Sequence, residues 1–174
     1  MSDPDNPFTP SANNHSNRRR HNRRQRHSAV HESGHIVACL TFDIMFSSAD
    51  IRGDKEIVGR VAVDFSDVPL DEQVITLLAG SAAERLLIPR GRTIADWLSS
   101  RADIQECEMA IYEAHPEWGE DETTTYLKRM RARAERIILD KKDAVLAIAG
   151  ALLRRGNLTA EDIGEVVKGL GVSA

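Results

Sequence analysis

Apolar residues follow a helical period over most of this sequence. Because a helix brings every third or fourth residue to one face, such spacing predicts helices that bury one side. After Gly156, Thr159 followed by Asp162 three residues later predicts the capped start of a short last helix. The longer helices that the pattern predicts cover residues 28–46, 70–88, 99–114, 122–139 and 141–155, with proline, glycine or serine breaks between most of them.

A different pattern lies between the first two predicted helices. The segment Ile57–Phe65, IVGRVAVDF, alternates β-branched and polar residues, which is typical of a strand with one buried face. A turn over residues 52–55 joins it to Ala49–Ile51, so we expect a hairpin. The expected fold class is therefore mainly α, a helical domain with one small β-hairpin.

The N-terminal residues differ from the rest in composition. Residues 1–17 are rich in Asn, Pro and Ser, with little to bury, and six arginines follow between Arg18 and Arg26. We expect a disordered basic leader over residues 1–27 and one domain over residues 28–174, since 174 residues suit a single core. Residues 1–30 carry a net charge of +4 although the whole chain has −4.

Composition also gives expectations for the cellular location of the protein. No run of about 18 uncharged apolar residues is present, so we expect no membrane span. The first residues lack the apolar core of a secretory signal, which favours a cytoplasmic protein. Cys39 and Cys107 lie in apolar helical patterns and form no CxxC pair, so we expect two buried thiols and no disulfide.

The stretch Ala29–Leu40, AVHESGHIVACL, contains the motif HExxH. Each residue of a helix advances about 100°, so His31 and His35 differ by about 40° and can bind one ion from one face. Glu32 is offset from that face and can take a proton from an attacking water. The motif predicts a zinc-binding helix with Glu32 as general base; the alternative is two histidines that share a face without metal.

Catalytic zinc usually has three protein ligands, and the motif supplies two. The arrangement HExxHxxGxxH would need Gly at position 38 and His at position 41, whereas the chain has Ala38 and Thr41. The third ligand must therefore come from another part of the fold. Spacing alone leaves four candidates, Glu84, Asp96, Asp103 and His115.

Four segments resemble, in order and spacing, the peptidase domain of the FtsH family of zinc proteases: HESGHIVACL, LLAGSAAERLL, SSRADIQECEMA and ALLRRGNLTAEDI. The resemblance runs from about Ser28 to Val167. It implies that His31 and His35 bind zinc, that Asp103 is the third ligand and that Glu32 is the catalytic base. It also implies that Glu84 supports the site from outside the ligand set.

The sequence departs from that family in two respects. Family members carry membrane segments and an ATP-driven unfolding module, and this sequence contains neither, with no GxxxxGK followed by Ser or Thr. We therefore expect a zinc-dependent, ATP-independent endopeptidase that cleaves unfolded or flexible protein segments, with a separate ATPase as a candidate partner. The alternative is an inactive zinc-binding adaptor. The strand Ile57–Val63 either binds an extended substrate by strand addition or is only structural.

The arginine-rich segment is a candidate for binding phosphates. It lacks interleaved aromatic residues, and the rest of the chain is acidic, so we favour a solvated helix start and do not expect nucleic acid as a partner. The remaining histidines, His15, His21, His27 and His115, are expected to be solvated.

Overall fold

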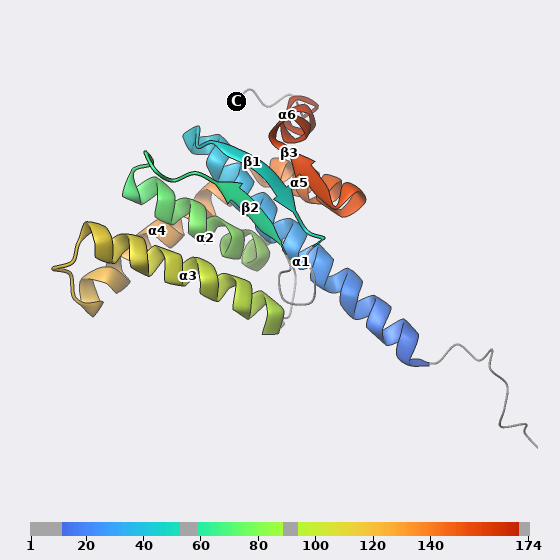
Figure 1. The fold of residues 1–174 in the computed structure, drawn as a ribbon, viewed down its shortest axis with the longest axis horizontal. Helices are drawn as coiled ribbons and strands as arrows, with labels where there is room; N and C mark the ends of the chain where they lie inside the picture. The colour runs from blue at the N-terminus through green and yellow to red at the C-terminus, as the bar shows by residue number, and fades with distance from the viewer. Residues whose placement is uncertain (1–11, 53–58, 89–93, 171–174) are drawn as a thin grey trace, which may run out of the picture.

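The computed structural model describes residues 12–52, 59–88 and 94–170, and for residues 12–20 and 94–100 it describes the backbone alone (Figure 1). In this part of the chain, six helices are combined with an antiparallel sheet of three strands. The mainly helical fold class is confirmed. The expected hairpin is present as two strands of that sheet, and the third strand comes from near the C-terminus.

The central element is α1 (Ala12–Phe42), which packs against α2 (Leu70–Leu87) and α5 (Lys142–Arg155). Every residue from 27 to 39 is buried. Small and apolar side chains allow this, because Ala29, Gly34 and Ala38 let neighbouring elements approach α1 closely. The HExxH motif therefore lies inside the protein.

The start of α1 corrects the expected boundary of the first helix. Residues 12–27, which we expected in a disordered leader, are helical, and the first turns extend away from the other helices (Figure 1). After Pro10 this segment has no proline or glycine, and its arginines are good helix formers. Adding turns to a helix that is already held in the core requires no new nucleation, so the helix continues outward.

The seam between α1 and α2 is close, and the centre of α2 is a stretch of small residues, Ala79–Ala83. A Cβ atom added at Gly34 would meet the carbonyl oxygen of Ala79, and would lie 2.9 Å from the Cβ of Ala83. On its other side α2 packs against α4 (Glu120–Asp140) and α3 (Ile94–Ala114). The helix α2 thus packs against both α1, which carries the histidines, and α3, which carries Asp103.

The sheet has the order β2-β1-β3, with β1 (Phe46–Asp50) between β2 (Arg60–Val63) and β3 (Asn157–Thr159). Ala49 is opposite Val61 on one side and Leu158 on the other. In Figure 1, β2 lies on the side of α2 and β3 lies beside α5 and α6. Most of the predicted turn over residues 52–55, and the first residues of the predicted strand, lie outside the described residues.

The C-terminal elements follow their predicted signals. Gly156 ends α5 with a left-handed φ of 79°, and Thr159 caps α6 (Ala160–Lys168), where its side chain accepts a hydrogen bond from the backbone N–H of Asp162. Cys39 and Cys107 are free and buried, as expected, and burial raises the pKa of each thiol to about 12. None of the described helices has the length and apolar character needed to cross a membrane.

Candidate metal centre

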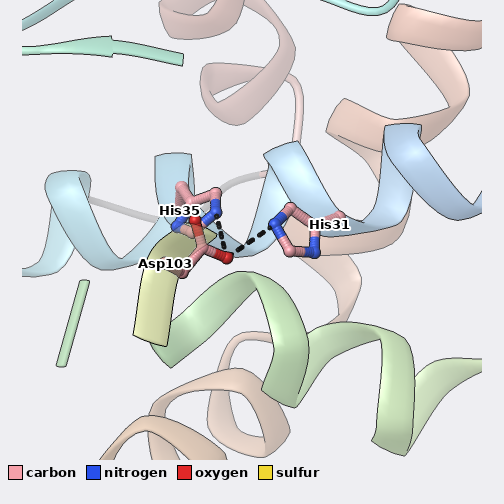
Figure 2. Close-up of side chains that lie close together, drawn as sticks. All are labelled: His31, His35 and Asp103. Atoms are coloured by element: carbon pink, nitrogen blue, oxygen red, sulfur yellow. Dashed lines mark ion pairs between the residues drawn. The ribbon is translucent and has the colours of Figure 1, made fainter. Parts of the chain in front are cut away.

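Two helices bring His31, His35 and Asp103 together. The two histidines are one turn apart on α1, and Asp103 reaches them from α3 (Figure 2). Asp103 Oδ2 lies 3.0 Å from His31 Nε2 and 3.7 Å from His35 Nε2. One ligand atom from each residue falls within 4.8 Å of the others, so this group could hold a metal ion.

Hydrogen bonds fix both imidazoles in the form that binds metals. His35 Nδ1 lies 2.8 Å from the backbone oxygen of Thr76, which can only accept a hydrogen bond, so this nitrogen is the donor. His31 Nδ1 lies 2.9 Å from Glu84 Oε1, a buried carboxylate that accepts in the same way. In the neutral rings each Nε2 therefore keeps its lone pair, directed towards Asp103.

The space in front of these nitrogens tests whether a metal fits. A Cβ atom added at Gly80 of α2 would lie 2.5 Å from His35 Nε2 and 2.7 Å from His31 Nε2. Zinc lies about 2.0–2.1 Å from an imidazole nitrogen, so a side chain at position 80 would occupy the space that an ion needs. Asp103 Oδ2 is buried and faces Nε2 of both histidines, as three ligands of one cation would. The donors fit a divalent ion.

Electrostatics in the group favour positive charge beside Asp103. Burial acts to raise the pKa of Asp103, but the nearby His35 and His31 outweigh it and lower the pKa below its ordinary value. Burial likewise acts to lower the pKa of His31, and the carboxylates of Asp103 and Glu84 outweigh it and hold that pKa well above its ordinary value. A cation suits this environment.

Glu32 follows His31 directly but points elsewhere, as the helical offset predicted. It is buried, and burial raises its pKa, an effect that His31 and His35 only partly oppose. Gly59, which precedes β2, lies against this carboxylate: a Cβ atom there would meet Oε1 and lie 2.9 Å from Cδ. The backbone at the start of β2 thus passes directly beside the predicted base.

The other candidates for third ligand lie in different positions. Glu84 contacts Nδ1 of His31, on the side of the ring opposite Nε2. His115 is near Glu117 and stacks on Trp118 at the end of α3, away from the group. The side chain of Asp96 lies outside the described residues. Among the described candidates, Asp103 alone approaches Nε2 of both histidines.

His27 was expected to be solvated, and this expectation is wrong. Its exposed fraction is 6%, and its Nδ1 lies 3.9 Å from Glu84 Oε2. Glu84 of α2 lies beside this turn of α1. Sequence reasoning also missed Gly59, Gly80 and the Thr76 carbonyl; the position of Gly80 in the small-residue stretch was the one available signal.

Comparison with known proteins gives no family for this chain, because no family model matches it and no curated protein matches it. The resemblance to FtsH-type peptidases therefore depends on the motifs and remains a prediction. What the described residues provide is a buried group of two histidines and an aspartate with a glutamate beside it.

Proposed function

We propose that this chain is a zinc-dependent endopeptidase, with His31, His35 and Asp103 as metal ligands and Glu32 as general base. One observation carries the proposal: three ligand atoms lie within 4.8 Å of one another, and Glu32 is the residue next to the first ligand. Two imidazoles and one carboxylate form a donor set that zinc accepts in hydrolytic sites.

Each residue of the site has a distinct task in peptide hydrolysis. When bound, the zinc ion supplies a Lewis acid that polarises the peptide carbonyl. Glu32 takes a proton from the attacking water and passes it to the leaving amine. Glu84 and the Thr76 carbonyl hold the two imidazoles in the required tautomer.

The edge of β2 is the proposed binding surface for substrate. Among the described strands β2 pairs only with β1, and we propose that an extended substrate segment pairs with its other edge. Gly59 brings the start of β2 beside Glu32. An extended peptide that adds to this edge would be held by main-chain hydrogen bonds close to the base, which favours unfolded or flexible segments over a particular sequence.

The proposal includes independence from ATP, because the sequence has no phosphate-binding GxxxxGK loop. Opening a folded domain costs about 5–15 kcal/mol, and this chain by itself has no means of supplying that energy. It would cleave only segments that are already loose. A separate ATPase that delivers unfolded chains would extend this range.

The test uses zinc-loaded protein, an unstructured casein-like substrate and a stable folded domain, each with and without ATP. We expect slow cleavage of the unstructured substrate, unaffected by ATP and abolished by a zinc chelator, with the folded domain intact. Glu32→Gln is the matched control: it should retain zinc and lower the rate about 10²–10⁴-fold, since an amide cannot accept the proton.

Three results would contradict the proposal. Equal rates for Glu32→Gln and the unmodified protein would exclude the base. ATP-stimulated digestion of the folded domain by this chain alone would exclude ATP independence. Zinc-loaded protein that cleaves no unfolded substrate would favour the inactive adaptor.

A further inference from the structure

The helix α5 is apolar on every side between its charged ends. Residues 144–153, AVLAIAGALL, contain no polar side chain, and charged residues stand directly before and after them. A helix that is apolar all round is normally buried on all sides. In α5 the side formed by Val145, Ile148 and Leu152 is buried, but the rest of the helix is not.

Leu146 and Leu153 lie on the uncovered side of α5. Their exposed fractions are 42% and 45%. Between them, Ala147 and Gly150 are only partly covered. Outside the backbone of α5 itself, the one described atom within 4 Å of a Cβ atom added at Gly150 would be Nη1 of Arg154, at 3.4 Å. This surface, which we call the α5 face (Leu146, Ala147, Gly150 and Leu153), therefore allows a second helix to approach closely.

Opposite charges lie on one flank of the α5 face. Asp143 and Arg154 are eleven residues apart, close to three whole turns, so their directions differ by only about 20°. Both side chains are exposed, and neither is in an ion pair with another described residue. The next arginine, Arg155, differs in this respect, because it lies 2.8 Å from Asp162. Lys142 points to the other flank, about 100° from Asp143.

We infer that a second copy of this chain covers the α5 face, with the two α5 helices antiparallel. In such a pair, with a twofold axis near Gly150, Leu146 of each copy meets Leu153 of the other. The same symmetry brings Asp143 of each copy within about one turn of Arg154 of the other copy, on the same flank. The face thus complements itself in shape and in charge. This inference does not depend on the proposed metal site.

Other arrangements fit the face less well. A parallel pair would place like charges together at both ends of α5 and would align the two helix dipoles, and both effects oppose association. An unrelated apolar partner would cover the leucines but would give no role to the opposite charges on one flank. An antiparallel second copy satisfies both features.

The experiment measures the mass of the full chain by sedimentation equilibrium, over a range of concentrations and with a chelator present. We expect a dimer in the micromolar range, since one helix pair forms a small interface. Asp143→Arg and Arg154→Asp should each weaken dimerisation about tenfold or more, because each creates two like-charge contacts in the symmetric dimer. An equimolar mixture of the two variants should restore dimerisation, because both contacts in that heterodimer again join opposite charges.

Leu146→Glu tests the apolar part of the interface. It should weaken dimerisation about 100-fold or more, because the symmetric dimer would bury the added charge twice. Met109→Glu is the matched control, since Met109 is an exposed apolar residue of α3, which lies away from α5 (Figure 1). It should dimerise like the unmodified chain. Thermal unfolding is measured for every variant, and if Leu146→Glu does not fold, Leu153→Glu replaces it with the same expected loss.

Three results would overturn the inference. The first is an unmodified chain that stays monomeric at every concentration up to about 100 μM. The second is a dimer that Leu146→Glu does not weaken, which would place the interface elsewhere. The third is a mixture of the two charge variants that associates no better than either variant alone, which would exclude the antiparallel pairing.

Discussion

Gly34 and Gly80 both lie on the seam between α1 and α2, but different atoms surround them. At Gly34 of α1, an added Cβ would meet the backbone of α2 at Ala79 and the side chain of Ala83. At Gly80 of α2, the nearest atoms are Nε2 of His35 and Nε2 of His31. Close helix packing explains the first glycine. The second leaves space in front of Nε2 of two histidines, the proposed metal ligands, which packing alone does not require.

The largest effect should come from Gly80→Ala. The added methyl group would lie where an ion must lie to contact both imidazoles, so we expect zinc affinity to fall more than about 100-fold, beyond the loss typical of a supporting residue. Both rings are buried and held by hydrogen bonds, so they must shift to admit the methyl group, and we also expect the free energy of unfolding without metal to fall by about 1–3 kcal/mol, despite the better helix propensity of alanine. Chelator competition and thermal unfolding measure the two effects. Unchanged zinc affinity would mean that the space has another cause.

Gly34→Ala should lower stability and leave zinc affinity unchanged. Its neighbours are the backbone of α2 and a core alanine, which cannot move without separating the two helices. We expect the free energy of unfolding to fall by about 1–3 kcal/mol, despite the better helix propensity of alanine. Urea unfolding of the metal-free protein measures this. A variant that is as stable as the unmodified protein but has lost zinc binding would reverse the assignment of the two glycines.

The smallest effect is expected for Gly164→Ala in α6. A Cβ atom at this position meets nothing within 4 Å, so the substitution changes helix propensity alone. The free energy of unfolding should rise by up to about 1 kcal/mol, with zinc affinity unchanged. The same two measurements apply, and a loss of zinc binding here would show that the effect of Gly80→Ala is not specific to its position.

The sequence predicts the parts of this site that lie on one helix. His31, Glu32 and His35 are placed by the period of α1, and the small residues of α2 indicate the close seam. The parts that depend on distant segments are harder to predict. Spacing left the third ligand open between residues on different helices, and the spacing on α1 does not show that Glu84 of α2 lies near His27 and His31.

For the fold as well, features set by local sequence are predicted better than features that depend on distant segments. The helices after Pro69 follow apolar periodicity and lie close to their predicted bounds, except that α3 begins at Ile94, before the predicted residue 99. β3 was missed because Asn157–Thr159 is too short for a periodic pattern, and its pairing with β1 joins residues far apart in the sequence. The prediction that the first helix begins at residue 28 was wrong, because the composition of residues 12–27 does not show that they extend a helix whose later turns are buried.

Titration of the metal-free chain with Zn²⁺, followed by calorimetry, tests the central claim most directly. The account predicts one ion per chain, with affinity weakened more than about 100-fold by Asp103→Asn and about 10–100-fold by Glu84→Gln, because Asp103 is a ligand and Glu84 orients one. Absence of zinc binding, or a larger loss in Glu84→Gln than in Asp103→Asn, would contradict it.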